Sequence, residues 1–314
     1  MPFDKLLVWA FGGTCTLLAI ATLIATALSA RARSDEAQAT VRNLRARIGA
    51  WWLIVFVFAA ALATGKAGAA VLFALVSFAA FSEFATLLKT SRYDHRALVT
   101  AFFIIAPLQY VFVYSGLYGM FTILIPVYAF LYVPMSLVLR GNTERFLERV
   151  ATIQWGLMIC IYCISYAPAL LMLNLRGSVD GGAKLLLFLV FVVQLSDVLQ
   201  YVCGKLLGKR PLAPSISPHK TWEGFIGGVV LASLAGAALW WLTPYTPLAA
   251  FAVSLGICLA GVVGGLTMSA VKRDRGVKDF GSILPGHGGM LDRIDSLCFA
   301  APILFHVTRY FFGG

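Results

Sequence analysis

The stretch Ser269–Asp295 reads SAVKRDRGVKDFGSILPGHGGMLDRID and joins two apolar segments, at about 247–270 and 291–311. Its 27 residues hold five lysines and arginines, four aspartates and one histidine, although only 12% of the whole chain is charged. Two of these carboxylates, Asp292 and Asp295, enter the second apolar segment, and carboxylates inside a membrane are costly and usually functional. A solvated loop would explain the cations but not the two carboxylates. We therefore expect this stretch to bind polyanions, and the metal ions that accompany them, at the edge of a membrane.

The composition predicts a polytopic membrane protein. Hydrophobic residues make up 60% of the chain and the mean hydropathy is +0.85, whereas a soluble domain carries roughly twice this charged fraction. We expect an all-α bundle of about ten transmembrane helices, with an N-terminal transmembrane region (1–184, about six helices) and a C-terminal catalytic one (185–314). Ten segments approach the length of about 20 residues that crosses a bilayer: approximately 6–30, 50–65, 69–88, 97–115, 118–139, 150–174, 185–203, 225–244, 247–270 and 291–311.

The distribution of lysine and arginine orients this bundle. One set of alternate loops (31–49, 89–96, 140–149, 204–224 and 271–293) holds 20 of the 25 lysines and arginines. Basic loops stay on the cytoplasmic side, so we predict that both termini are non-cytoplasmic and that the charged stretch faces the cytoplasm. The same bias accounts for the net charge of +11, which therefore does not indicate a nucleic-acid partner. For the loop 31–49, a short amphipathic helix on the leaflet and a plain linker both remain open.

Two further carboxylates, Glu83 and Asp197, lie inside apolar runs. Ionised groups at such positions need a cation, a metal ion or a water-filled cavity. Gln194, Asp197 and Tyr201 follow helical spacing and share one face. They predict a polar stripe that does not face lipid.

A second loop also carries residues suited to phosphate. It contains the run Ser217-Pro-His-Lys-Thr-Trp-Glu-Gly224. We interpret Ser217 and Thr221 as helix-entry residues, with Glu223 following them, and an ordinary capped helix start is the alternative interpretation. Lys220 beside the free amides of a helix N-terminus would suit a phosphate.

The spacing of Asp292 and Asp295 indicates metal-assisted chemistry. Residues three apart on a helix face the same way, and two such carboxylates flanked by cations suit Mg²⁺ bound to nucleotide phosphates. Phosphoryl and nucleotidyl transfer depend mainly on positioning and charge neutralisation. The chain has no Walker loop, which disfavours an ATPase or kinase of that type.

At this point the residues resemble a known family, the CDP-diacylglycerol synthases, also called phosphatidate cytidylyltransferases. The resemblance covers about 190–311 and is only generic before that. It is carried by Ser269-x2-Lys272-Arg273-x4-Lys278-Asp279, Pro285-Gly-His287-Gly-Gly and Asp292-Arg293-Ile-Asp295, and upstream by Asp197, Tyr201, Gly204, Gly208 and Ser217-Pro-x-Lys220-Thr-Trp-Glu-Gly224. It implies that CTP and phosphatidate give CDP-diacylglycerol and pyrophosphate in phospholipid biosynthesis, at the cytoplasmic side of a bacterial inner membrane.

The resemblance also implies roles for single residues. Mg²⁺ would be bound by Asp292, Asp295 and Asp197. Binding of a second divalent ion or of a monovalent cation at the same site is left open. The catalytic set would be Asp292, Asp295, Lys272 and Arg273. CTP or the lipid phosphate would contact Lys220, Ser217, Thr221, Glu223, Lys278, Asp279, His287 and Arg293. For His287 we expect a hydrogen bond to phosphate rather than a base. The resemblance further suggests a homodimer, although runs of small residues fit packing within one subunit equally well.

One departure separates this chain from many family members. Where they read Gly-Asp-Leu-x-Glu-Ser, this chain has Gly264-Gly265-Leu-Thr-Met268-Ser269. If the family Asp is a metal ligand, this site has one carboxylate fewer. Two kinds of function are alternatives to phosphatidate cytidylyl transfer. One is a cytidylyl- or phosphotransferase that acts on another lipid phosphate or on a polyprenol. The other, outside the enzymes, is a transporter or an inactive homologue.

Overall fold

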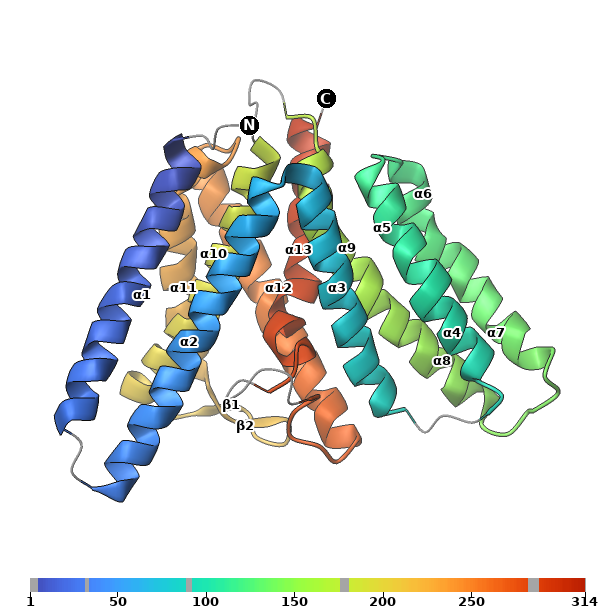
Figure 1. Cartoon of the computed structure of the whole chain (residues 1–314), viewed down its shortest axis with the longest axis horizontal. Coiled ribbons are helices and arrows are strands. Elements are labelled where there is room, and N and C mark those ends of the chain that lie inside the picture. Colours follow the sequence, from blue (N-terminus) through green and yellow to red (C-terminus); the bar gives the residue numbers. More distant parts are fainter. Residues whose placement is uncertain (1–4, 32–33, 89–91, 176–180, 282–287, 314) are drawn as a thin grey trace.

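The computed structural model describes residues 5–31, 34–88, 92–175, 181–281 and 288–313 of the chain. Nearly all of them are helical, as the sequence predicts (Figure 1). The elements are α1 (Lys5–Arg31), α2 (Asp35–Ala63), α3 (Gly65–Thr86), α4 (His95–Thr100), η1 (Ala101–Ile105), α5 (Ala106–Tyr114), α6 (Tyr118–Ile123), η2 (Leu124–Ala129), α7 (Phe130–Val138), α8 (Phe146–Leu157), η3 (Met158–Cys163), α9 (Ile164–Ala169), η4 (Leu170–Met172), α10 (Gly181–Leu207), β1 (Pro211–Ala213), β2 (Ser217–Thr221), α11 (Trp222–Ala238), η5 (Trp240–Leu242), α12 (Pro247–Asp274) and α13 (Leu291–Phe312).

Within these described ranges, eight helical rods are long and apolar enough to cross a bilayer. They correspond to eight of the ten apolar segments that the sequence predicts. The other two segments are also helical, but α11 has only 17 residues and α13 carries Asp292, Arg293, Asp295 and Arg309. The polytopic all-α class is confirmed. Of the two helices that are too short or too charged to count among the eight, α11 follows the second loop and α13 follows the charged stretch.

Three of these helical rods contain a short π-helical segment within an otherwise α-helical stretch. Wider π-helical turns, η1, η2 and η3, interrupt the rods 95–114, 118–138 and 146–172. Proline lies in or soon after each of them, at Pro107, Pro126 and Pro168. Because proline has no amide hydrogen and its ring crowds the preceding turn, a local change of winding accommodates it within a helix.

The last four helices form the part of the bundle that carries the charged stretch. Helices α10 and α11 approach each other closely at Gly228, which has no side chain. A Cβ at this position would lie 2.5 Å from the backbone nitrogen of Gln200. Helix α13 packs against α12, α9 and α3, so its buried residues belong to the same core as those of the N-terminal half.

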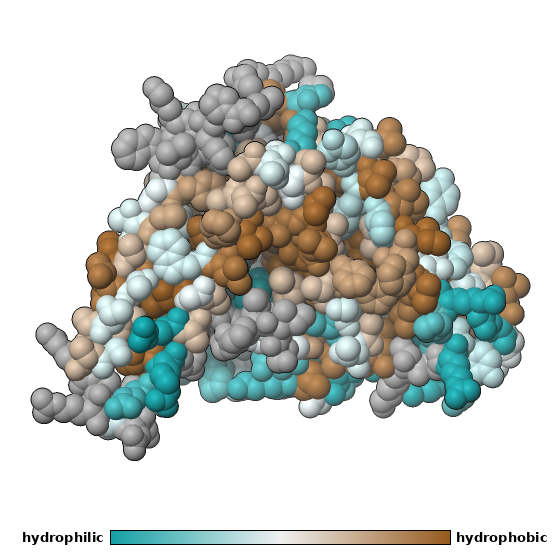
Figure 2. All heavy atoms as spheres, in the orientation of Figure 1, coloured by the Kyte–Doolittle hydropathy of each residue, from teal (hydrophilic) through white to brown (hydrophobic). Residues whose placement is uncertain are grey.

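The two ends of the bundle carry different parts of the chain. Helix α1 begins and α13 ends at one end, whereas the β1–β2 hairpin lies at the other (Figure 1). Apolar residues cover the middle of the visible face, and hydrophilic residues gather along the end with the hairpin (Figure 2). The charged stretch and the second loop therefore meet at one polar end of an apolar bundle.

Two local expectations were wrong. Within the region 31–49, residues 35–49 form neither a linker nor a separate surface helix, because α2 begins at Asp35 and continues to Ala63. Ser217 does not enter a helix but begins strand β2, which pairs antiparallel with β1 through Ala213 and Ser217 and through Pro211 and Thr221. Thr221, by contrast, caps α11 as expected: its hydroxyl accepts a hydrogen bond from the amide of Gly224 at 3.2 Å.

Candidate active site

A cavity of about 780 Å³ lies where α10, the β1–β2 hairpin and the first turns of α13 meet. Five of the residues for which we expect a catalytic, substrate-binding or metal-binding role line it, although they come from three separate parts of the chain. These are Asp197, Lys220, Thr221, Asp292 and Asp295. The structure therefore brings together the polar stripe of α10, the second loop and the paired aspartates.

The Asp197 and Asp295 carboxylates form the negative part of this cavity. They are close enough to repel each other, and Lys220 is close enough to attract both. One oxygen of Asp295 accepts a hydrogen bond from the amide of Ser296 at 2.7 Å, while the other lies beside Gly265. Two carboxylates beside a cation, at the wall of a cavity, can share a hard divalent cation with bound phosphates.

Asp292 has a different environment, because its carboxylate is already surrounded by donors. Lys272 Nζ lies 2.8 Å from Oδ1, and the amides of Phe280 and Gly289 donate to Oδ2 at 2.9 and 3.0 Å. Its side chain is only 6% exposed. Asp292 therefore ties α12, the segment after it and α13 together at the rim of the cavity.

Glu223 holds the second loop in place. Its Oε2 accepts hydrogen bonds from the amides of Lys209 and Arg210, at 3.0 and 3.2 Å. These bonds hold the pKa of the half-buried Glu223 carboxyl below its usual range. The loop between α10 and β1 is thus fastened to the first turn of α11, next to Thr221 and Lys220 in the cavity wall.

The other predicted residues lie around the cavity rather than in its wall. Arg273 Nε donates to the carbonyl of Ile216 at 3.3 Å and so joins the end of α12 to the hairpin. Lys278 and Asp279 are exposed, and Arg293 is close enough to Asp197 to attract its carboxylate. His287 lies outside the described residues.

The partners of Glu83 differ from those that the sequence led us to expect. Its carboxylate, which is 5% exposed, accepts hydrogen bonds from two main-chain amides of the described residues. Met290 N donates to Oε1 at 2.8 Å and Leu291 N donates to Oε2 at 2.9 Å. A carboxylate of the N-terminal half therefore lies at the start of α13, two residues before Asp292.

Sequence reasoning missed several residues of the cavity wall. Gln200, Lys205, His219 and Ser296 line it together with the predicted residues. His219 lies inside the run 217–224 and Ser296 directly follows Asp295, so adjacency to the motifs was a usable signal for both. Gln200 lies one turn beyond Asp197 on α10, where helical spacing could also have found it.

The glycine that departs from the family pattern borders the same cavity. A Cβ on Gly265 would lie 3.2 Å from Lys220 Nζ and 3.7 Å from Asp295 Oδ2. Met268, one turn further along α12, is fully buried in the core. Position 265 therefore faces the charged groups of the site, whereas position 268 does not.

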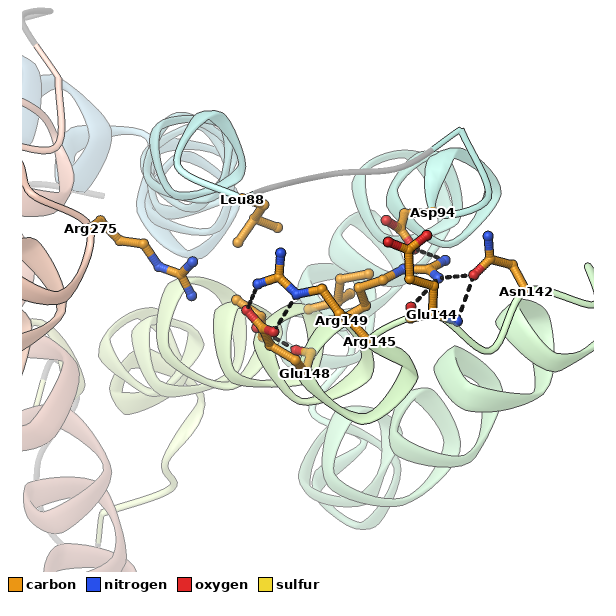
Figure 3. A pocket seen from close by; sticks show the side chains of 10 residues that line it. Leu88, Asp94, Asn142, Glu144, Arg145, Glu148, Arg149 and Arg275 are labelled. Carbon is orange, nitrogen blue, oxygen red and sulfur yellow. Dashed lines mark hydrogen bonds and ion pairs between the residues drawn. The ribbon is translucent and has the colours of Figure 1, made fainter.

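A second, smaller pocket of about 120 Å³ lies among the ends of α3, α4, α8 and α12 (Figure 3). Its charges are largely neutralised within the pocket. Arg149 pairs with the buried Asp94 at 2.6 Å and also donates to Asn142 at 3.0 Å, while Arg145 pairs with Glu148. We attribute a structural role to this pocket, since its cations are committed to neighbouring carboxylates, and take the larger cavity as the active-site candidate.

Comparison with known proteins agrees with this geometry. Residues 45–311 match the sequence profile of the Cytidylyltransferase family. The chain is 40% identical over 267 residues to the uncharacterized protein YnbB of Escherichia coli K12, covering 84% of this chain and 87% of that protein. It is 35% identical over 217 residues to the phosphatidate cytidylyltransferase of Bacillus subtilis, with 68% and 77% covered.

A third relative covers less of the chain. The phosphatidate cytidylyltransferase of Aquifex aeolicus is 39% identical over 140 residues, which is 45% of this chain and 53% of that protein. The profile match extends from the middle of α2 to the end of α13 and so includes both Glu83 and the cavity. This chain belongs to the cytidylyltransferase family and is a membrane-embedded nucleotidyltransferase.

Proposed function

We propose that this protein transfers the cytidylyl group of CTP to phosphatidate and so forms CDP-diacylglycerol and pyrophosphate. The observation that carries the proposal is the cavity in which Asp197 and Asp295, from two helices of the bundle, lie beside Lys220. The cavity is at the polar end of an apolar bundle, where a water-soluble nucleotide and a bilayer lipid can both reach it. The names of two relatives support phosphatidate as the acceptor.

The reaction is a displacement at phosphorus. A phosphate oxygen of phosphatidate attacks the α-phosphorus of CTP, and the bond from that phosphorus to the oxygen bridging to the β-phosphate breaks. The electron pair leaves with pyrophosphate. Because the lipid phosphate is already anionic at neutral pH, no protein base is needed for the attack. Lys220 would offset the negative charge of the phosphates. The hairpin, whose preceding loop is bonded to Glu223, would hold Lys220 in place.

We further propose that Asp197 and Asp295 would hold the Mg²⁺ ion, with Asp292 at its edge. No group of three or more metal-binding side chains occurs among the described residues, but Mg²⁺ in nucleotide sites commonly takes one or two carboxylates and completes its shell with phosphates and water. When bound, it would neutralise charge on the departing pyrophosphate. The donor set therefore suits an ion that arrives with CTP.

We also propose that the protein lies in the inner membrane with the cavity facing the cytoplasm. Both ideas rest on the excess of lysine and arginine in the loops at the cavity end and on the cytoplasmic supply of CTP. A homodimer stays a prediction.

The proposal can be tested by choice of acceptor and of label. Purified protein would be given CTP labelled at the α- or the γ-phosphate, with vesicles containing phosphatidate, polyprenyl phosphate or a lipid without a phosphomonoester. We expect label in lipid only from the α-position and only with phosphatidate. If α-label enters lipid only with polyprenyl phosphate, the acceptor is polyprenyl phosphate and not phosphatidate. If γ-label enters lipid, the protein is a lipid kinase instead.

A further inference from the structure

Glu83 makes a contact across the molecule that the proposed reaction does not use. It belongs to α3, more than 200 positions before the residues that it binds. Its two carboxylate oxygens each accept one main-chain amide, from Met290 and from Leu291, at 2.8 and 2.9 Å. These amides stand at the very start of α13.

The first amides of a helix have no partner inside the helix, and the N-terminus carries the positive end of the helix dipole. A side chain just before the helix usually satisfies one of these amides. In α13 that position is Met290, whose side chain makes no capping hydrogen bond. The cap is instead supplied by Glu83, and its negative charge suits the dipole.

The segment around the carboxylate is shaped to admit it. A Cβ on Gly289 would lie 2.4 Å from Glu83 Oε2, and a Cβ on Gly281 would lie 2.6 Å from Oε1. Any larger residue at either position would displace the carboxylate, the backbone or both. Gly281 and Gly289 thus both pack closely against the Glu83 carboxylate, and Gly289 lies two residues before the helix that Glu83 caps.

This contact borders the residues to which we assign the chemistry. Gly289, which packs on Glu83, also donates its amide to Asp292 Oδ2 at 3.0 Å. Asp292 lies in the first turn of α13 and Asp295 one turn later, and both line the cavity. Glu83 itself does not line the cavity, so it would act through α13 and not on the substrate.

We propose that Glu83 is a positioning residue: it fixes the N-terminus of α13 and thereby the placement of Asp292 and Asp295 for catalysis. The catalytic part of this inference rests on the proposed function. It also assigns the N-terminal half a direct part in the site, because α3 supplies a contact without which the first turn of α13 has no cap.

The test compares Glu83→Gln and Glu83→Asp with Ser77→Ala in the full-length protein. Gln keeps the size of the side chain but turns an NH₂ group toward one of the two amide donors, and Asp keeps the charge on a shorter stem. Ser77 is the matched control, since it lies on the same helix, is fully buried, and hydrogen-bonds Tyr110 away from the cavity.

Two readouts keep the inference separate from the proposed function. The first is hydrogen exchange of peptides that cover Met290 and Leu291, which we expect to be about tenfold faster in Glu83→Gln, as for loss of a helix cap. The second is CTP-dependent lipid labelling, where we expect kcat to fall about 100-fold with little change in the KM for CTP, as for a misplaced catalytic group. Glu83→Asp should recover part of both, and Ser77→Ala should change neither.

If Glu83→Gln behaves like Ser77→Ala in both readouts, the inference is wrong. Faster exchange with unchanged kcat would overturn the positioning role and leave only a structural cap. If the wild-type protein labels no lipid, the proposed function fails, but the exchange measurement still decides whether Glu83 holds the start of α13.

Discussion

Lys272 and Asp292, twenty residues apart in the charged stretch, form an ion pair with Lys272 Nζ 2.8 Å from Asp292 Oδ1. Their side chains are 14% and 6% exposed, so the pair is largely removed from water. It joins the end of α12 to the first turn of α13. The pair therefore stabilises the rim of the cavity as well as contributing charge to it.

Removing Lys272 alone should therefore lower the stability of the folded protein. Lys272→Met leaves Asp292 buried without its cation, and breaking such a pair costs about 3 kcal/mol. We expect a clear fall in the thermal unfolding temperature in detergent. Adding Asp292→Asn to Lys272→Met should cost much less than Asp292→Asn does in the wild-type background. Strictly additive effects of the two substitutions would show that the pair contributes no coupling energy.

The two aspartates of α13 should differ in what they contribute. Asp295 faces Asp197 and Lys220 in the cavity, so Asp295→Asn and Asp197→Asn should each lower kcat by about 100-fold or more with the fold retained. Both should also raise the Mg²⁺ concentration needed for half-maximal activity. Asp292→Asn should lower stability more than either of them. Activity as a function of Mg²⁺, measured beside thermal unfolding, separates these outcomes; equal Mg²⁺ dependence in wild type and Asp295→Asn would contradict the assignment.

Glu223 predicts a dependence of stability on pH. Amide hydrogen bonds from Lys209 and Arg210 lower the pKa of its carboxyl in the folded protein, so its contribution is present above the unfolded pKa of about 4.3 and is lost as the pH falls through the lower folded value. Glu223→Gln should therefore lower the unfolding temperature at neutral pH, and the difference from wild type should shrink below about pH 4. A difference that grows on acidification would show that the ionised carboxylate is not what holds the loop.

Position 265 should tune the metal requirement. Gly265→Asp would place a third carboxylate between Lys220 and Asp295, because a Cβ there lies within 3.7 Å of Asp295 Oδ2. We expect half-maximal activity at a severalfold lower Mg²⁺ concentration, since each added carboxylate strengthens the binding of a hard cation. Gly265→Ala is the matched control and should leave the Mg²⁺ dependence unchanged, because the flexible end of Lys220 can move aside. An unchanged requirement in Gly265→Asp would place the metal ion elsewhere.

The sequence was sufficient to predict the helical membrane class and the meeting of Asp197, Lys220 and Asp295. Apolar length and charge patterns are local, which is why they predict the class. The meeting of the three residues was implied by the family resemblance that their motifs carry. The role of Thr221 as a helix cap followed from the same local pattern. The hairpin at Ser217 was not predicted, because a strand of five residues with a proline in it has no clear alternation.

The contact of Glu83 with Leu291 could not be predicted for a different reason. An embedded carboxylate indicates that it must have a partner, but main-chain amides leave no mark in the sequence that names them. Only the packing of α3 beside α13 identifies them. The same holds for Asp292, whose residue type suits a metal ion while its contacts in the fold include one lysine and two amides.

The central claim is that this cavity transfers the cytidylyl group of CTP to phosphatidate. The most direct measurement quantifies CDP-diacylglycerol and pyrophosphate by mass spectrometry and a coupled assay, using purified protein in phosphatidate vesicles with Mg²⁺, with a chelator, and with Asp295→Asn. We predict the two products in equal amounts, formed only with Mg²⁺ and nearly abolished by Asp295→Asn. Folded wild-type protein that forms neither product, or Asp295→Asn that forms both at the wild-type rate, would contradict the account.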